Sequence, residues 1–371
     1  MYENEVQKAQ ERLNAALSLS KNAPDEAVNM ILDMEKWVDE TLPHDCNEYY
    51  GIIITYNEVM GDLKHRRGKF VEAEPFYKKM ILTTQKLYEQ DKEKYDLRLA
   101  QGYQKLANNC RFSLGMHMFT QSPVTLNEKT QVPYDAAVRF YKIAITVTDA
   151  NAKKGSGKHL ELRAACIISL AILNACTGNY RDAINMYKDA VSIQKAIYQT
   201  LDNKESGANL GTSLTSLATL YTLYKDTEKA QECLEDSIFT LSEHENEDSV
   251  RAGILIARNY VNLAGTLMSN KADKEEIDAA YDKGIKKISM VNAIAGNAAL
   301  ADEVTCYMLS GQYYKLTGNS EKGDSQLNHA LSLVKPMLEA QPDNKQLEVL
   351  KIRIEMLLRG EKPDMTGEVK A

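Results

Sequence analysis

Residues 155–158, with the sequence GSGK, are of the types that hold phosphate groups in nucleotide-binding proteins. Such a loop needs the pattern G-x-x-x-x-G-K-[ST] directly after a β-strand, so that consecutive backbone N–H groups face the phosphates. Here Ala152 occupies the place of the first glycine and His159 that of the hydroxyl residue. A helical pattern, not a strand, precedes the segment. We therefore interpret residues 150–158 as a flexible loop and predict no nucleotide site.

Histidine, cysteine and methionine side chains are the other candidates for chemistry. The six histidines are too widely spaced to place two on one helical face, and the zinc-site patterns CxxC and HExxH do not occur. Met116, His117 and Met118 carry soft-metal ligands, but adjacent helical residues point in different directions. A GxSxG nucleophile elbow is also missing. We expect no metal, no cofactor and no catalytic residue, and hence a protein that is not an enzyme.

Composition and charge narrow the class of protein. Hydrophobic residues make up 44% and charged residues 26%, as in an ordinary folded, water-soluble chain. The net charge of −7 argues against nucleic-acid binding through bulk charge, and no apolar run reaches the ~18 residues that span a bilayer. The six cysteines stand mostly at apolar helical positions, which predicts buried free thiols in a reducing compartment. We expect a cytoplasmic protein.

Small residues recur at a nearly constant interval along the whole chain. The intervals are 46, 46, 64, 47, 46 and 47 residues, and the long one contains two candidate loops, residues 120–133 and 150–158. A period of this size is typical of stacked helix pairs. The small residues are Ala15, Gly61, Ala107, Ala171, Ala218, Ala264 and Gly311.

The clearest copy of the repeat runs from Leu170 to Val191. Gly178 stands where the first helix must stop, in a left-handed conformation that suits glycine. Ala183, Tyr187 and Ala190 follow at spacings of four and three, which places them on one face of the second helix. Small residues on both helices predict a close approach between the two.

This pattern resembles the tetratricopeptide repeat, and the phrases at 68–81 (GKFVEAEPFYKKMI) and 178–191 (GNYRDAINMYKDAV) resemble the kinesin-light-chain variety. The period here is longer than is usual in that family, so each helix is expected to span roughly 28 Å. The aromatic residue that many members carry early in the first helix is absent from most copies. The resemblance implies an all-α solenoid of about seven antiparallel helix pairs.

The expected organisation is one domain over residues 1–360. Its units lie near residues 2–43, 44–93, 94–150, 158–202, 206–245, 248–293 and 297–341. A capping helix is predicted at 344–360, because apolar residues repeat there at helical spacing without a partner helix. Residues 361–371 are expected to form a flexible tail.

The resemblance implies that the first helix of each pair lines a concave groove that binds a protein or peptide segment. Amide and cationic side chains stand at its ends, and apolar and hydroxyl side chains stand between them. Glu58 and Asp62 occupy places where a carboxylate clamp would need basic and amide residues, so capture of an EEVD-like tail is not expected. The residues implied in partner binding are Gln104, Lys105, Asn108, Arg111, Ile168, Ile172, Thr215, Thr219, Arg258, Asn262, Gln312 and Lys315.

A non-catalytic scaffold or adaptor is the function we favour, with a protein or peptide partner and neither nucleic acid nor membrane. One alternative is a peptide-responsive regulator similar to the bacterial quorum-peptide receptors, which is disfavoured because no effector module precedes the first unit. Another is a regulatory subunit of a larger enzyme complex, such as a caspase-like protease. The oligomeric state and the completeness of the chain stay open at this stage.

Overall fold

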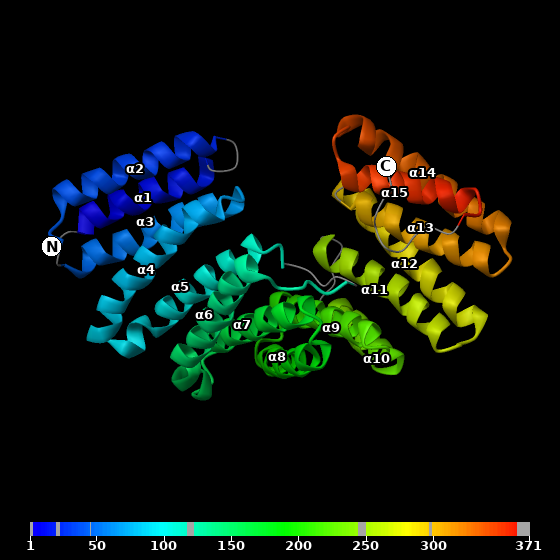
Figure 1. Cartoon of the computed structure of the whole chain (residues 1–371), viewed down its shortest axis with the longest axis horizontal. Helices are drawn as coiled ribbons and strands as arrows, with labels where there is room; N and C mark the ends of the chain where they lie inside the picture. Colours follow the sequence, from blue (N-terminus) through cyan, green and yellow to red (C-terminus); the bar gives the residue numbers. More distant parts are fainter. Residues whose placement is uncertain are drawn as a thin grey trace. The chain divides into compact units, whose positions relative to one another are not determined.

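The computed structural model describes residues 3–19, 23–44, 46–116, 122–243, 250–296 and 299–361, and every regular element in these ranges is an α-helix. Successive helices fold back on one another (Figure 1). The all-α prediction is therefore confirmed for the described residues. The helices are α1 (Glu3–Leu19), α2 (Pro24–Thr41), α3 (Asn47–Arg66), α4 (Phe70–Gln90), α5 (Lys92–Ser113), α6 (Glu128–Lys153), α7 (Gly157–Cys176), α8 (Tyr180–Leu201), α9 (Lys204–Leu223), α10 (Thr227–Glu243), α11 (Val250–Ser269), α12 (Lys274–Ala295), α13 (Leu300–Leu316), α14 (Ser320–Ala340) and α15 (Lys345–Leu358).

Each predicted unit range contains two of these helices, with bounds that agree to within about three residues. The expected capping helix is α15, which packs on α14. Its side chains Leu347, Ile354 and Leu357 join a buried cluster with Val304 of α13 and Val334 of α14. The apolar spacing in this last segment thus predicted the face that it buries.

The chain forms two compact units, residues 1–197 and 198–371. The first contains α1 to α7 and most of α8, and the second contains the end of α8 and α9 to α15. The expectation of a single domain over 1–360 stays a prediction. The predicted tail lies outside the described residues from position 362 onward.

Small residues in the first helices allow the second helices to approach closely, as the repeat predicts. A methyl group added to Gly61 of α3 would lie 2.6 Å from the ring of Tyr77 on α4. One added to Gly311 of α13 would lie 2.7 Å from Leu327 and 3.0 Å from the carbonyl oxygen of Gly323, both on α14. These contacts are too short for any side chain larger than a hydrogen, so both pairs depend on glycine here.

In the first predicted repeat, residues 2–43, the buried small residue does not lie at the position that the period gives. Ala15 is exposed on α1, and its neighbour Ala16 is fully buried. The prediction at Ala15 is therefore wrong by one residue. The reason is that the face of α1 that meets α2 is set by Leu13 and Ala16 together, which share a buried cluster with Ala27 of α2.

Both candidate loops in the long interval differ from their predicted bounds. The helix α6 begins at Glu128, because Asn127 and Thr130 form a reciprocal capping box, and it includes Pro133. It continues to Lys153, so that only residues 154–156 separate it from α7. The interpretation of 150–158 as a flexible loop is wrong. Residues 117–121, which include His117 and Met118, lie outside the described part of the chain.

The described part of the other loop lies against the end of α7. The backbone N–H of Val124 donates to the carbonyl oxygen of Cys176 at 2.7 Å. Pro123 approaches Gly178, whose φ of +84° confirms the left-handed stop predicted for this glycine. The insertion is thus anchored to the turn between α7 and α8.

Polar contacts between consecutive helix pairs recur at nearly one separation in the sequence. Outside the long interval, the two residues of such contacts are 39 to 47 positions apart, near the period of the small residues, and several pairs are 42 to 44 apart. The contacts fix the register in which one pair stacks on the next within each unit. Five of the pairs that are 42 to 44 apart are Asp25–Arg67, Glu35–Lys79, Asp62–Lys105, Thr215–Asn259 and Arg258–Asp302.

The helix α7 is the one described helix that is long and apolar enough to cross a membrane by length and composition. In its most apolar window, 56% is buried inside the protein. Its buried residues include Leu162, Leu170 and Leu173, which belong to the same apolar cluster as Tyr141 of α6. Packing within the first unit therefore accounts for its hydropathy.

Candidate functional site

In the first compact unit, residues 1–197, the predicted site residue Lys105 forms two ion pairs. Its ammonium group lies 2.8 Å from Asp62 Oδ2 and 3.2 Å from Glu58 Oε1, both on α3. Arg98, two turns earlier on α5, lies 2.5 Å from Glu58. The first helices α3 and α5 thus face each other through two carboxylates and two cations.

This cluster is neutral and half-buried rather than a free positive patch. The side chains of its four charged members are 20% to 29% exposed. The hydroxyl of Tyr77 on α4 also donates to Asp62, at 2.8 Å. Burial and the nearby Asp62 carboxylate raise the pKa of Tyr77 above its ordinary value. A partner that uses Lys105 must compete with carboxylates already in place.

Arg111 was predicted to face the partner, and this is wrong. It is 7% exposed. Its Nε donates to Tyr141 Oη at 3.2 Å and its Nη1 to the carbonyl oxygen of Met116 at 3.0 Å. The carbonyl it satisfies lies just beyond the end of α5, so the guanidinium serves the turn after that helix. The same Tyr141 hydroxyl donates to Asn108 Oδ1 at 2.6 Å, which also draws Asn108 into the fold.

The apolar part of the predicted surface is present on α7. Ile168 and Ile172 are both half-buried, one helical turn apart. Ile172 packs at the edge of the cluster that contains Leu170 and Leu173. Gln104 on α5 is also half-buried. These three side chains keep part of their surface exposed.

In the second compact unit, residues 198–371, the hydroxyl of Thr215 takes part in a polar network within the fold. Its hydroxyl lies 3.0 Å from Ser237 Oγ and 3.0 Å from Asn259 Oδ1, and both of these side chains are fully buried. The network joins α9, α10 and α11. By contrast, Thr219, one turn further along α9, is exposed and donates only to the carbonyl oxygen of Thr215.

The predicted cations of the second unit are also paired. Arg258 on α11 forms an ion pair with Asp302 on α13. Lys315 donates to Asp324 at 2.6 Å and to the carbonyl oxygen of Leu358 at 3.0 Å, so it holds the last turn of α15. A partner that uses Lys315 must compete with these contacts. Asn262 is exposed on α11 and Gln312 half-buried on α13.

Sequence reasoning missed a buried polar network that joins α5, α6 and α7. His159 Nε2 lies 3.0 Å from Asp96 Oδ1, and His159 Nδ1 lies 2.7 Å from Ser156 Oγ. Asn151 donates to the other Asp96 oxygen at 2.6 Å. An acid, a histidine and a serine in this order can activate a nucleophile. Asp96 and His159 are only 5% and 8% exposed, and we assign the network to holding three helix ends together.

Within the described ranges, no group of three or more His, Cys, Asp or Glu side chains is arranged to hold a metal ion. Cys166, Cys176 and Cys306 are buried, whereas Cys46, Cys110 and Cys233 are half-buried. The prediction of buried thiols is therefore right for three of the six cysteines.

No family model and no curated protein matches the chain. Solved structures share its fold. BtubC (BKLC) from P. vanneervenii is 19% identical, with 79% of this chain and 92% of that one covered and a TM-score of 0.51. The apo form of RapI is 10% identical, with coverage of 90% and 99% and a TM-score of 0.52.

A third similar structure is a signal transduction ATPase of the STAND class from Pyrococcus horikoshii, which has a tetratricopeptide repeat sensor. It is 13% identical with a TM-score of 0.51, and the match covers 98% of this chain and 51% of that one. This chain thus spans about half the length of that protein. Identities this low concern the fold alone, and the fold is a tetratricopeptide-like helical repeat.

Proposed function

We propose that this chain is a non-catalytic scaffold or adaptor that binds a segment of another protein along its first helices. The observation that carries the proposal is the relation of Thr219 on α9 to Asn262 on α11. Both side chains are exposed, and they are 43 positions apart, close to the separations of 43 and 44 in the contacts Asp62–Lys105 and Thr215–Asn259 between consecutive first helices. We name the surface of α9, α11 and α13 formed by the exposed Thr219 and Asn262 and the half-buried Gln312 the first-helix face of the second unit.

The chemistry of this face suits a peptide backbone. A hydroxyl and two amides can each donate to a carbonyl oxygen and accept from an N–H group. The nearby Arg258 is neutralised by Asp302, so charge contributes little to recognition there. We expect binding that depends on hydrogen bonds and changes only weakly with salt concentration.

The first unit offers a different anchor. Ile168 and Ile172 present half-buried apolar surface on α7, and Gln104 on α5 supplies a nearby amide. Burying one partner side chain against such a surface contributes about 1.5–3 kcal/mol. The proposed partner is therefore a protein segment with at least one large apolar side chain, encountered in the cytoplasm, and neither a nucleic acid nor a membrane.

Affinity purification of the full chain from its native lysate, followed by variants, tests this proposal. We expect Asn262→Arg to reduce recovery of the co-purified protein at least fivefold, because an arginine there blocks the first-helix face. The matched control is Asn328→Arg, which makes the same change at an exposed position of α14, a second helix. Equal recovery with both variants would contradict the proposal.

A second pair of variants tests the proposal separately in the first compact unit, residues 1–197. Ile168→Glu places a charge on the apolar anchor of α7, and Val71→Glu makes a comparable change at a side chain of α4 that is 86% exposed. We expect the first substitution alone to weaken partner recovery. Thermal unfolding of both variants shows whether each one is folded.

A peptide-responsive regulator is the second candidate. The observation that favours it is the shared fold with a tetratricopeptide repeat that serves as a sensor in the STAND protein. A regulator of this kind changes conformation when its peptide binds. A change in small-angle scattering on addition of the purified partner segment supports it, and identical curves with bound partner contradict it.

A further inference from the structure

Helix α6, the second helix of its pair, carries an open groove. This groove is not part of the first-helix face. The groove has a volume of about 480 Å³ and is lined by residues of α6 alone within the described part of the chain. Its lining residues extend from Asp135 to Val147, which corresponds to about 18 Å along the helix. We call this surface the α6 groove.

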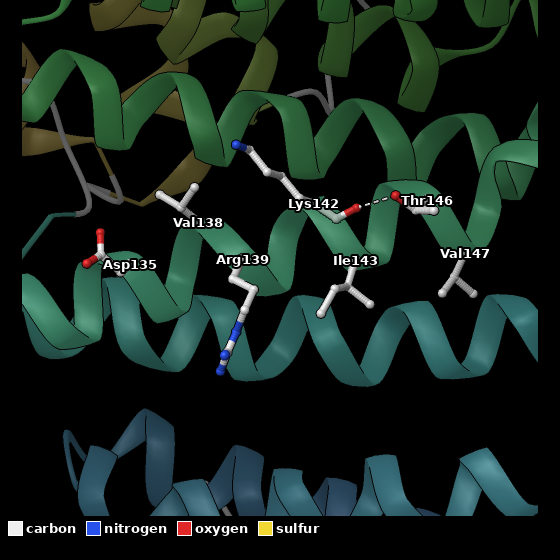
Figure 2. A pocket seen from close by; sticks show the side chains of 7 residues that line it. All are labelled: Asp135, Val138, Arg139, Lys142, Ile143, Thr146 and Val147. Atoms are coloured by element: carbon white, nitrogen blue, oxygen red, sulfur yellow. Dashed lines mark hydrogen bonds between the residues drawn. The ribbon is translucent and has the colours of Figure 1, made fainter.

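Two rows of side chains project from α6 along this groove (Figure 2). Val138 and Lys142 form one row, and Arg139 and Ile143 form the other. Each row therefore combines an apolar side chain with a cation. Asp135, at the start of the groove, adds one carboxylate, which accepts from Gln131 Nε2 at 2.9 Å. Val147 continues the apolar surface one turn beyond Ile143.

The apolar part of the groove is only half covered by the fold. Val138, Ile143 and Val147 are all half-buried. Val132, two turns before Arg139 on the same side of the helix, is 72% exposed. A row of partly exposed β-branched side chains along one helix is a surface that gains free energy when another apolar surface covers it.

The two cations of the α6 groove differ from those of the predicted site. Lys105, Arg98, Arg258 and Lys315 each have a carboxylate partner. Arg139 and Lys142 are exposed, and neither has a carboxylate within ion-pair distance among the described residues. The Arg139 guanidinium lies 5.0 Å from the ring of Phe140, which holds it along the helix without neutralising it.

We propose that the α6 groove is a second docking site that binds an acidic amphipathic helix of another protein, about three turns long. Its apolar side chains would cover Val138, Ile143 and Val147, and its carboxylates would pair with Arg139 and Lys142. The match in charge and length favours this partner. The groove extends over three turns of one helix, which is the length that a short helix presents to its neighbour.

The site differs from the proposed first-helix face in both position and chemistry. It belongs to the second helix of its pair and recognises charge. Binding at the α6 groove should therefore weaken as salt rises, whereas binding at the first-helix face should not. The two proposals can fail separately, since Asn262→Arg leaves the α6 groove unchanged.

Fluorescence anisotropy with a designed peptide tests the inference on the full chain. The probe is a labelled 12-residue helix with leucines on one face and glutamates beside them. Its counterpart has lysines in place of the glutamates. We expect the acidic peptide to bind, and the double variant Arg139→Glu/Lys142→Glu to weaken its affinity at least tenfold, whereas the basic peptide shows no binding to the unaltered chain.

The matched control is Lys286→Glu/Lys335→Glu, which makes the same change in net charge at exposed positions of α12 and α14. It should bind the acidic peptide like the unaltered chain. A further variant, Val138→Thr, keeps the shape and the charges but removes apolar surface, and it should weaken binding about threefold. Circular dichroism and thermal unfolding establish that each variant is folded.

Three results would overturn the inference. One is equal affinity for the acidic peptide in the groove variant and the charge-matched control. Another is equal affinity of the unaltered chain for the acidic and basic peptides. The third combines two results: neither peptide binds, and the unaltered chain binds vesicles of anionic phospholipid, whereas Arg139→Glu/Lys142→Glu does not. That outcome would identify a membrane surface as the ligand.

Discussion

The Lys105 ammonium on α5 and the Asp62 carboxylate on α3 are 2.8 Å apart. The same carboxylate accepts the hydroxyl of Tyr77 on α4, also at 2.8 Å. One side chain thus connects three helices and two consecutive repeats. This arrangement explains why the acidic residues that exclude a carboxylate clamp are present: they fix the register between repeats.

Replacement of Asp62 by alanine should destabilise the first unit. It removes the partner of both Lys105 and Tyr77, in a cluster where the charged side chains are about a quarter exposed. We expect the free energy of unfolding to fall by about 1–3 kcal/mol, measured by urea unfolding.

The control for this prediction is Glu74→Ala, which removes an ion pair within one helix. Glu74 lies 2.6 Å from Lys78, and both side chains are more exposed than those of the Asp62 cluster. Its effect on unfolding should be clearly smaller. A larger loss for Glu74→Ala than for Asp62→Ala would contradict the assigned role of Asp62.

Replacing either of two glycines in α3 by alanine should change the free energy of unfolding, in opposite directions at the two positions. A methyl group at position 61 meets the Tyr77 ring at 2.6 Å, whereas a methyl group at position 51 has no neighbour within 4 Å. We expect Gly61→Ala to lower stability by about 1–3 kcal/mol through overpacking. Gly51→Ala should raise it by up to about 1 kcal/mol, since alanine is the better helix former. Urea unfolding of the two variants compares them directly.

The repeat could be predicted from the sequence because close packing limits the residue types at these points. Gly61 and Gly311 leave room for Tyr77 and Leu327 and nothing larger fits. Ala15 was misplaced since α1 carries two adjacent alanines and only the buried one meets α2. The period of small residues is thus clear in the sequence where a helix–helix contact admits only a small residue, and unclear where a larger residue also fits.

The candidate site was less predictable because exposure depends on residues distant in the sequence. Arg111 is covered by Tyr141, which follows it only after the insertion. Thr215 is turned inward by Ser237 and Asn259, on two different helices. Helical spacing alone gives the face of a residue but does not identify the partners that neutralise or cover it.

The Asp96–His159 contact should hold the start of α7 in place. His159→Ala removes a hydrogen-bond partner from a carboxylate that is 5% exposed, and the expected loss is about 1–3 kcal/mol. Hydrogen exchange should show the fastest new exchange in α7 near residues 157–162. Ser156→Ala, which removes only the outer member of the network, should have a smaller effect. Unchanged exchange in α7 after His159→Ala would argue against this role.

Stability should fall in alkaline solution because of buried thiols. Burial raises the pKa of Cys166 from 9.0 to about 12, and Cys306 shifts in the same way. In the unfolded chain these thiols ionise from about pH 9, so the unfolded state binds fewer protons above that value. Each buried thiol should reduce stability by at most about 1.4 kcal/mol per pH unit between pH 9 and 12.

Urea unfolding at pH 8, 9, 10 and 11 measures this slope. Cys166→Ala should make it shallower, whatever its effect on the absolute stability at pH 8. A stability that stays constant from pH 9 to 11 in the unaltered chain would contradict the assignment of buried, neutral thiols.

Site-specific photo-crosslinking shows whether a partner protein contacts the first-helix face. A photoreactive phenylalanine derivative is placed at Thr219, on the first-helix face, or at Leu82, a 64% exposed residue of the second helix α4. We expect the co-purified partner to be captured from position 219 and not from position 82. Capture from position 82 alone, or equally from both positions, would contradict it.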